Sequence, residues 1–218
     1  MKVTVVKNVL DANNRIAEEN GKLFDQHKMF VINLMSSPGA GKTSLVEQTI
    51  TALRDGYRIA VIEGDVQDTY DADRIAKLDI PVVQINTGGA CHIDGNMIRE
   101  TFPAFDFGKI DLLIVENVGN LVCPAEFKIG ENMKIMLLST PEGADKPAKY
   151  PLMFQESSAL LINKMDLLPY VDFDLEKARR DALALNKDLK IFEVSCKSGA
   201  GLTAWFNWLG RQIDTFKK

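Results

Sequence analysis

A glycine-rich stretch with a lysine is the first part of the sequence whose residue types could bind a ligand. Residues 36–43 are SSPGAGKT, which matches the phosphate-binding pattern GxxxxGK[ST] except at its first position, where Ser36 replaces glycine. Glycines let backbone amides turn toward phosphate oxygens, and the N-terminus of a following helix adds partial positive charge. Lys42 would reach the β and γ phosphates, and the Thr43 hydroxyl would bind magnesium. The residues expected to contact phosphate are Ser37, Pro38, Gly39, Ala40, Gly41, Lys42, Thr43 and Ser44.

The alternative for this stretch is a glycine-rich turn between a strand and a helix, with a lysine that faces solvent. An apolar run precedes the stretch and a helical pattern follows it, which is the context that a phosphate-binding loop requires. We therefore expect a nucleotide site here.

Two later segments predict which base the nucleotide carries. The sequence NKMD at residues 163–166 directly follows the apolar run SSALLI. A carboxylate at Asp166 can accept hydrogen bonds from guanine N1–H and its exocyclic amine, a donor pair that adenine lacks. The sequence SCKSG, which follows IFEV, resembles the SAK loop of GTPases, whose backbone amide meets guanine O6. The predicted nucleotide is GTP or GDP, and the residues expected around it are Asn163, Lys164, Asp166, Ser195, Cys196 and Lys197.

Acidic residues at the ends of two apolar runs are candidates for a Mg²⁺ site. The run DLLIVENVG contains Glu116, and its ExxG spacing to Gly119 takes the place of DxxG in GTPases. We expect Glu116 to reach the magnesium shell, Gly119 to sense the γ-phosphate, and Asp65 to bind magnesium or orient the attacking water. Ordinary solvation of strand ends is the alternative, but ligands bind at the carboxyl edge of such sheets. The predicted catalytic residues are thus Lys42, Asp65 and Glu116, with Thr43, Asp65 and Glu116 at magnesium.

Slow turnover is expected from two features of the sequence. Asn120 stands where some GTPases carry a water-positioning glutamine, and no arginine finger is recognisable. This combination predicts a nucleotide switch rather than a metabolic hydrolase.

Three residues with metal-binding side chains lie in two predicted loops. Cys91 and His92 are adjacent in NTGGACHIDG, and Cys123 lies four residues beyond Gly119. Thiolate and imidazole suit Ni²⁺ or Zn²⁺. Because adjacent residues in an extended chain point apart, we expect the Cys-His pair to need a second copy, across a symmetric dimer, to complete a coordination shell. Free cysteines are also often small buried apolar residues, so the spacing alone leaves both interpretations open.

The elements between these motifs must bring the loops to one edge of a sheet. Seven short apolar runs alternate with amphipathic stretches, which is typical of buried parallel strands joined by helices. The expected fold class is α/β, a P-loop NTPase with a mostly parallel central sheet and helices on both faces, plus an N-terminal helical segment. The expected strands are MFVINLM, RIAVIEG, VVQINT, DLLIVEN, KIMLLST, ALLINK and IFEVS. The clearest helices are expected after Gly41, over about 71–77, and in DLEKARRDALAL and GLTAWFNWLGRQI.

The N-terminal part of the chain differs from this pattern. Residues 8–26 carry apolar residues at about helical spacing with Gly21 as an interruption, so one helix or a pair of short helices is expected. We divide the chain into an N-terminal helical segment, 1–28, and a P-loop GTPase domain, 29–218. The stretch TPEGADKPAKYPLM, with three prolines, is expected to be a long irregular connection.

Composition argues against several classes of function. The 218 residues are 46% hydrophobic and 26% charged, which suits one large domain. The net charge is −4, with acidic and basic residues interspersed, so no nucleic-acid footprint is expected. No apolar stretch is long enough to cross a bilayer, and three sparse cysteines suit a reducing compartment. We expect a cytoplasmic protein without a membrane partner.

Together, these motifs resemble one known family. The combination SSPGAGKTSL, EGD, TGGACHIDGNMI, ENVGNLVCPAEF, DKPAKYP, INKMDLLPY and SCKSGAGL is similar to the HypB family, the nickel-incorporation GTPases of nickel-iron hydrogenase maturation. The resemblance covers nearly the whole chain in order, and the Cys-His pair with VCPAEF is much more specific than the phosphate loop. It implies a dimerising P-loop GTPase, forming a GTP-dependent homodimer. It also implies a nickel or zinc site at the subunit interface, built from Cys91, His92 and Cys123.

The same resemblance implies a task and partners. It implies delivery of nickel to the hydrogenase large-subunit precursor, together with a small zinc-containing accessory protein, HypA. In such a dimer, Lys146 and Lys149 are candidates for contacting the nucleotide of the other subunit. The chain departs from some members in having only two histidines, with no histidine-rich tract and no N-terminal cysteine motif. Only the nucleotide-linked metal site is therefore expected.

Other functions are alternatives to this one. The urease accessory GTPase shares fold, nucleotide and metal, but it typically carries Cys-Pro-His, whereas here Cys91 is followed directly by His92. The methylmalonyl-CoA mutase chaperone has no reason to combine these cysteines. A metal-binding scaffold with a structural nucleotide and an ATP-driven small-molecule kinase are further alternatives, and NKMD argues against the kinase.

Overall fold

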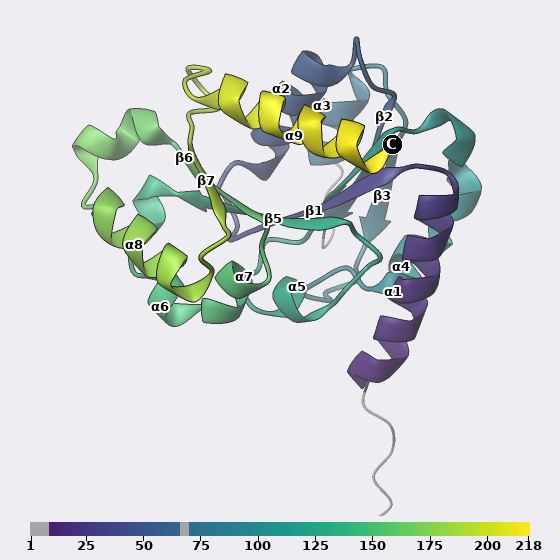
Figure 1. Ribbon diagram of the computed structural model, residues 1–218, viewed down its shortest axis with the longest axis horizontal. Coiled ribbons are helices and arrows are strands. Elements are labelled where there is room, and N and C mark those ends of the chain that lie inside the picture. Colours follow the sequence, from purple (N-terminus) through teal and green to yellow (C-terminus); the bar gives the residue numbers. More distant parts are fainter. Residues whose placement is uncertain (1–8, 66–69) are drawn as a thin grey trace, which may run out of the picture.

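A seven-stranded sheet is the centre of the computed structural model, which describes residues 9–65 and 70–218 (Figure 1). Residues 1–8, the start of the expected N-terminal segment, and residues 66–69 lie outside the described part. The strand order is β3-β2-β4-β1-β5-β6-β7, and every neighbouring pair is parallel. The strands are β1 Phe30–Ser36, β2 Ile59–Asp65, β3 Val82–Asn86, β4 Leu112–Glu116, β5 Met133–Ser139, β6 Ala159–Asn163 and β7 Lys190–Glu193. The seven expected strands and the α/β fold class are confirmed.

Helices cover both faces of the sheet, and short 3₁₀ turns connect some of them. The turns are η1 Phe102–Ala104, η2 Phe107–Lys109, η3 Thr140–Glu142 and η4 Met165–Tyr170. The helices are α1 Val9–Gln26, α2 Lys42–Leu53, α3 Tyr70–Ala76, α4 Gly95–Glu100, α5 Cys123–Glu126, α6 Lys146–Lys149, α7 Pro151–Gln155, α8 Leu175–Leu185 and α9 Leu202–Phe216. The central strands are buried on both sides, which explains why they are continuous apolar runs rather than alternating ones.

Alternate residues of the same strands point to opposite faces and form separate cores. From β1, Ile32 and Leu34 pack with α2 and α9, whose Trp205 is fully buried. On the other face, Met35 packs with α5, α7 and α8. Val31 lies in a third cluster, beside α1 and α4. In Figure 1, α9 runs along one side of the sheet, with α5 and α7 on the other.

The N-terminal helix α1 is one continuous helix that Gly21 does not interrupt. Gly21 instead lies where the backbone of Gly130 crosses the helix, and a methyl group added at Gly130 would come within 2.8 Å of the Gly21 nitrogen. Phe24 of α1 belongs to the same core cluster as Val31 of β1. The helix therefore packs into the third core cluster against the sheet, and Figure 1 shows it at one end of the sheet.

The stretch with three prolines is more regular than the sequence suggested. It forms η3, α6 and α7, three short helical pieces, instead of a long irregular connection. Each piece has a proline in its first turn, where the missing N–H costs no hydrogen bond. Prolines there start helices, and the expectation was wrong because it treated all of them as breakers.

Within the described part of the chain, none of the helices is both long enough and apolar enough to span a bilayer.

Candidate functional site: a nucleotide cleft joined to a thiol-imidazole cluster

The glycine-rich loop connects β1 to α2 at the carboxyl edge of the sheet. Gly39 and Gly41 have φ values of 74° and 103°, a region that L side chains adopt at a cost and glycine adopts freely. Lys42 begins α2, and its ammonium group donates to the Ser36 hydroxyl at 3.2 Å. Ser36, the one departure from the motif, is fully buried. Its hydroxyl therefore holds Lys42 in the loop.

The predicted base-binding residues surround one cavity of about 440 Å³. The Asn163 side chain donates to the Ala40 carbonyl at 2.9 Å and accepts from the Cys196 backbone at 3.1 Å. Lys164 donates to the Gly39 carbonyl at 2.7 Å. These bonds tie the phosphate loop to both predicted guanine segments. The cavity is lined by Gly41, Ser44, Asn163, Lys164, Asp166, Leu167, Cys196 and Lys197.

Asp166 lies at the wall of this cavity, with one of its oxygens already bonded. The Ser195 hydroxyl donates to Asp166 Oδ1 at 2.6 Å, which fixes the carboxylate and leaves its other oxygen for a ligand. Burial raises the pKa of the neighbouring Cys196 thiol to about 11, so this cysteine is neutral and packs as an apolar residue. The geometry suits recognition of a base by its N–H groups.

A second cavity, of about 290 Å³, lies on the other side of Lys42. The Thr43 hydroxyl donates to Glu116 Oε1 at 2.9 Å there. Glu63, Asp71 and Glu116 bring carboxylate oxygens within 4.8 Å of one another. The cavity is lined by Pro38, Gly39, Lys42, Glu63, Gly64, Asp65, Asp71, Glu116, Asn117, Val118 and Gly119. Its position beside the phosphate loop suits the terminal phosphates and their cation.

The acidic cluster has the properties of a hard-cation site. Among the described residues, Glu63 Oε2 and Glu116 Oε2 are buried oxygens without a hydrogen-bond partner. Burial, reinforced by the Glu116 carboxyl, raises the pKa of Glu63 to about 11. Burial also raises the pKa of Glu116, opposed by the charge of Lys42. Two crowded carboxyls hold a proton that a divalent cation would replace, and an all-oxygen donor set is what Mg²⁺ prefers.

The expected magnesium residues are only partly the ones that cluster. Thr43 and Glu116 lie together as expected, while Asp65 lines the cavity without belonging to the acidic cluster. Glu63 and Asp71 belong to it, and the sequence reasoning missed both. Along β2, Glu63 and Asp65 point to the same side of the sheet, but Glu63 pairs in register with Glu116. An acid inside an otherwise apolar strand was the available signal.

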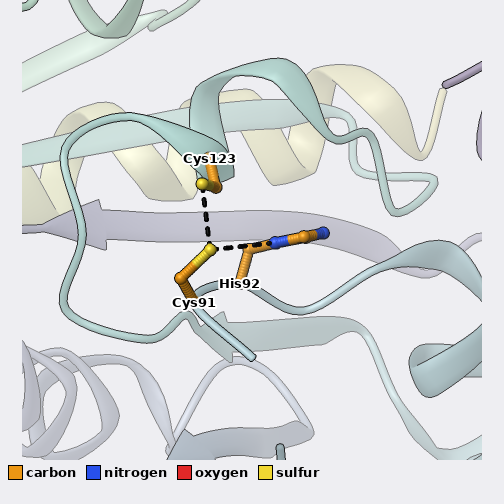
Figure 2. Close-up of side chains that lie close together, drawn as sticks. All are labelled: Cys91, His92 and Cys123. Carbon is orange, nitrogen blue, oxygen red and sulfur yellow. Dashed lines mark hydrogen bonds between the residues drawn. The ribbon is translucent and has the colours of Figure 1, made fainter. Parts of the chain in front are cut away.

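Cys91, His92 and Cys123 form one cluster within a single chain (Figure 2). The two thiols are 2.9 Å apart, and Cys91 Sγ lies 3.7 Å from His92 Nδ1. The expectation that Cys91 and His92 point apart was wrong, because the chain bends at these residues instead of running extended. Three ligand atoms within 4.8 Å make a soft N/S donor set that suits Zn²⁺ or Ni²⁺.

The electrostatics of this cluster favour a bound cation. A hydrogen bond with Cys91 and partial burial raise the pKa of Cys123, so the metal-free Cys123 thiol keeps its proton. Burial lowers the pKa of His92, against the opposing charges of Asp94 and Glu126, so the imidazole has a lone pair available near neutral pH. Metal binding would release thiol protons but none from the imidazole.

Neighbouring side chains hold the cluster in place. The His92 ring stacks on Phe127, with centroids 3.8 Å apart. Asn120 donates to the Cys91 carbonyl at 3.2 Å and accepts from the Val122 amide at 2.8 Å. The Asn120 amide therefore faces the metal loop, where the sequence suggested only a position equivalent to a water-positioning glutamine.

One segment joins the cation cavity to the thiol cluster. Glu116 ends β4, Gly119 follows it, and Cys123 begins α5. Gly119 approaches the phosphate loop so closely that a methyl group there would come within 2.9 Å of Pro38. Asn117, fully buried, accepts from the Ile93 amide at 3.0 Å. The loop beside the phosphates thus contacts both halves of the metal site.

The segment after β5 also reaches the phosphate loop. The Ser37 hydroxyl donates to the Glu142 carboxylate, which in turn accepts from the Ser139 amide at 2.8 Å. Lys146 donates to the Glu142 carbonyl at 2.6 Å, while Lys149 pairs with Asp145 and is more than half exposed. Glu142 was not identified from the sequence, because its contact with Ser37 spans more than one hundred residues.

A larger cavity, of about 580 Å³, lies away from this chemistry, between α1 and the start of β5. Lys128, Glu131 and Lys134 are among its charged lining residues, and none of the predicted site residues lines it. The size of a cavity therefore does not identify the functional site in this protein. The site is identified instead by the polar groups that converge at the carboxyl edge of the sheet.

Comparisons with known proteins agree with this geometry. Residues 30–193 match the family model "CobW/HypB/UreG, nucleotide-binding domain". The hydrogenase maturation factor HypB of Escherichia coli K12 is 48% identical over 204 residues, which cover 94% of this chain and 70% of that protein. The probable HypB of Methanocaldococcus jannaschii is 37% identical, covering 98% of this chain and 96% of that protein.

Solved structures give the same result. The crystal structure of HypB from Helicobacter pylori in complex with nickel superposes with a TM-score of 0.88 at 37% identity, covering 95% of this chain and 97% of that one. HypB from Archaeoglobus fulgidus superposes with a TM-score of 0.87 at 35% identity, covering 93% of this chain and 99% of that one. The residues that match the family model, 30–193, include the phosphate loop, the acidic strand ends and the thiol loops. The chain therefore belongs to the HypB family of hydrogenase maturation factors, within the broader CobW/HypB/UreG nucleotide-binding family.

Proposed function

We propose that this protein is a GTP-hydrolysing nickel chaperone, in which GTP-dependent dimerisation is linked to metal binding at Cys91, His92 and Cys123. The observation that carries the proposal is the short path between the two sites: Glu116, in the acidic cluster, and Cys123, in the thiol cluster, belong to one continuous segment. The nickel complex of the Helicobacter pylori relative supports nickel as the cargo here, and Zn²⁺ suits the same donors.

The nucleotide is proposed to be GTP, bound by the loop and the two base segments. Asp166, held by Ser195, accepts from the guanine N–H groups, and Asn163 and Lys164 brace the loop beneath the base. Ser37 to Ser44 surround the phosphates, with Lys42 turning from Ser36 toward the β and γ positions. Cys196 and Lys197 complete the wall of the base cavity.

Hydrolysis is proposed to use the acidic cavity. When bound, Mg²⁺ neutralises the charge on the β and γ phosphates. Thr43 and Glu116 would hold it, with Glu63 and Asp71 beside them, and Asp65 would orient the attacking water. Lys42 stabilises the charge that develops on the transferred phosphoryl group. With Asn120 directed at the metal loop, no glutamine-like group is available at that position to position water, and intrinsic turnover is slow.

The metal is proposed to be cargo that this cycle takes up and releases. Gly119 contacts the terminal phosphate, and the segment after it carries Cys123. A second copy of the chain completes the coordination shell or the nucleotide contacts, with Lys146 and Lys149 as candidate contacts across the dimer. The recipient is the hydrogenase large-subunit precursor, with a HypA-type zinc protein as accessory partner. The free, sparse thiols support the reducing cytoplasm as the proposed compartment for this work.

The experiment that tests this function titrates Ni²⁺ into the protein with GDP and with a non-hydrolysable GTP analogue, while light scattering follows the molar mass. We expect different Ni²⁺ affinities in the two states and a higher mass with the GTP analogue. By linkage, bound nickel must change nucleotide affinity by the same factor. Identical affinities with both nucleotides would overturn the proposed coupling. Loss of Ni²⁺ binding in Cys91→Ala and Cys123→Ala, with GTP binding retained, is the matched control.

Turnover provides an independent check. A measured intrinsic rate of tens per second would contradict a slow switch, and retention of nickel delivery by Lys42→Ala would favour a scaffold in which hydrolysis is irrelevant.

A further inference from the structure

Two buried asparagines on α1 contact the two segments that carry the thiol-imidazole cluster. Asn13 and Asn20 are 7% and 1% exposed. They are two helical turns apart, so they lie on the same face of α1. Neither belongs to the nucleotide cleft, and neither forms part of the cluster itself. Buried amides of this kind are costly unless every polar atom has a partner, so their partners indicate what they do.

Each asparagine bridges the same pair of segments. Asn13 accepts from the Gly95 amide at 2.8 Å and donates to the Lys128 carbonyl at 2.8 Å. Asn20 donates to the Gly95 carbonyl at 2.7 Å and to the Ile129 carbonyl at 3.3 Å. Both backbone groups of Gly95 are therefore held from α1, and so are two successive carbonyls of the second segment.

The backbones of both segments also pack closely against the α1 backbone. A methyl group at Gly95 would lie 3.1 Å from the Ala17 nitrogen and 3.2 Å from Asn13 Oδ1. Gly130 has a φ of 103°, and a methyl group there would lie 2.9 Å from the Ala17 carbonyl oxygen. A side chain at Gly130 would clash with the helix, and one at Gly95 would be tightly crowded, so small residues at both positions let the two segments lie close to the helix.

An arginine adds further bonds between the first segment and α1. Arg99, on α4, donates to Asn20 Oδ1 at 3.2 Å and to the Glu19 carboxylate at 2.7 Å. With this bond, both polar atoms of the Asn20 amide are used. The α1 face thus anchors α4, which begins three residues after His92.

The two anchored segments lead directly to the metal ligands. From Gly95 the chain runs back through buried Ile93 to His92 and Cys91. From Lys128 it runs back through Phe127, which stacks on His92, to Cys123. Both ligand-bearing segments are therefore held by α1, and Asn117 and Asn120 hold the Cys91–His92 segment further, at the Ile93 amide and at the Cys91 carbonyl.

We propose that Asn13 and Asn20 are positioning residues for the metal site: α1 sets the spacing between the Cys91–His92 segment and the Cys123 segment, and so sets metal affinity independently of the nucleotide. This inference depends on the proposed metal-binding role of Cys91, His92 and Cys123. Metal ligands tolerate errors of only about 0.2 Å in distance, so even a small shift between two segments weakens the site. Partners that orient ligands typically change metal affinity by 10- to 100-fold.

The test measures Ni²⁺ and Zn²⁺ affinity in the full chain for Asn13→Ala and Asn20→Ala. Asn14→Ala is the matched control, because Asn14 is an exposed asparagine next to Asn13 on the same helix. We expect affinity to fall at least about tenfold in both bridge variants, with GTP affinity unchanged in all three. The near-ultraviolet thiolate-to-nickel charge-transfer band should weaken or shift in the bridge variants alone.

A metal-free measurement separates positioning from general loss of structure. Oxidised glutathione converts two neighbouring thiols to a disulfide and releases two glutathione thiols, at a rate that depends on how often the thiols meet. In the metal-free protein, this rate for Cys91 and Cys123 should fall in Asn13→Ala and Asn20→Ala. The rate should be unchanged in Asn14→Ala.

The outcomes distinguish this inference from the proposed function. If the wild-type protein binds neither metal, the proposed function fails. If the wild type binds metal and both folded bridge variants bind it equally well, the inference alone is wrong. Should Asn20→Ala lose its folded state, Asn13→Asp decides, because it keeps an acceptor for Gly95 and replaces the donor to the Lys128 carbonyl by a carboxylate oxygen that repels that carbonyl. Unchanged metal affinity in that variant would overturn the inference, and reduced affinity with normal GTP binding would support it.

Discussion

The side chain of Asn117 accepts a hydrogen bond from the Ile93 amide at 3.0 Å. Asn117 directly follows Glu116 of the acidic cluster, and Ile93 directly follows His92 of the thiol cluster. Because both residues are fully buried, the bond joins two loops through a rigid part of the molecule. It is a direct physical connection between the cation cavity, which Asn117 lines, and the Cys91–His92 segment.

Removing the Asn117–Ile93 hydrogen bond should reduce the effect of the bound nucleotide on metal affinity. In Asn117→Ser the side chain no longer reaches Ile93, so we expect the ratio of Ni²⁺ affinities with GDP and with a GTP analogue to move toward one. Asn33→Ala is the control, because Asn33 accepts from Asn117 Nδ2 at 3.0 Å on the opposite side and leaves the Ile93 bond in place. Nickel titrations in both nucleotide states give the ratio. Full coupling in a folded Asn117→Ser protein would exclude this route.

A second prediction concerns Glu63, an acid of the proposed magnesium site. Burial keeps Glu63 protonated at neutral pH, so Glu63→Gln replaces a neutral group by a neutral group of the same shape. The metal-free protein should therefore keep its stability, while affinity for Mg²⁺ in the presence of GTP should fall on the order of tenfold. Asp65→Asn is the comparison. If Asp65→Asn weakens Mg²⁺ binding and Glu63→Gln does not, the acidic cluster is not the cation site.

The difference between Glu63 and Asp65 shows where sequence reasoning ends. The seven apolar runs could be recognised because strands buried on both faces must be apolar along their length. Glycines, Lys42 and Thr43 could be recognised because phosphate binding requires those types at that spacing. Which acid lies in the proposed cation site depends on strand register, here the pairing of Glu63 with Glu116. The spacing of residues along the sequence does not reveal how neighbouring strands pair.

The same limit applies to the supporting contacts. Glu142 meets Ser37, and Asn20 meets Ile129, across more than one hundred residues of chain. A glutamate or an asparagine has no local pattern that reveals such a contact. Cys91 and His92 were expected to point apart because an extended backbone was assumed. A bend at these residues was not predictable from their side chains.

Base selectivity should depend on Asp166. Asp166→Asn replaces an acceptor-only carboxylate by an amide that cannot accept both guanine N–H bonds. The lost charged hydrogen bonding is worth about 3 kcal/mol. The preference for GTP over ATP should therefore fall on the order of 100-fold. Ser195→Ala should have a smaller effect, since it removes only the hydroxyl that orients Asp166. Competition binding with labelled GTP measures both. Unchanged selectivity for GTP over ATP in Asp166→Asn would mean that other residues recognise the base.

The close thiols predict a specific oxidation product. With Cys91 Sγ and Cys123 Sγ 2.9 Å apart, oxidised glutathione should form a mixed disulfide that the second thiol then displaces, giving an intramolecular disulfide and two glutathione thiols. Bound Zn²⁺ should protect both residues, because it occupies the thiolates. Cys196→Ser should behave like wild type, since Cys196 is buried and its pKa is raised to about 11. Peptide mapping by mass spectrometry identifies the linked pair, and preferential linkage of Cys196 would contradict the arrangement.

Stability at acidic pH should depend on Asp111, which joins the start of β4 to β2 and to the C-terminal end of the chain. Arg58 donates to Asp111 Oδ1 and Oδ2 at 2.7 and 2.9 Å, and Lys217 donates to Oδ1 at 2.6 Å. These bonds, the Arg58 guanidinium above all, hold the pKa of Asp111 far below its ordinary value. Since the folded pKa is lowered, the stabilisation is complete above the unfolded pKa of about 3.9 and is lost as the pH falls toward the folded pKa.

Asp111→Asn should therefore lower the free energy of unfolding by about 2 kcal/mol at pH 7, the cost of weakening charged hydrogen bonds to a mostly buried carboxylate. Between pH 6 and pH 3 the difference in unfolding free energy between wild type and Asp111→Asn should narrow by about 1 kcal/mol, because only the wild-type protein loses the contribution of the Asp111 carboxylate. Urea unfolding at several pH values measures the gap. Asp106→Asn, which removes an exposed partner of Lys109, should show no measurable loss at any of them. A gap for Asp111→Asn that stays constant with pH would mean that its cost comes from packing rather than charge.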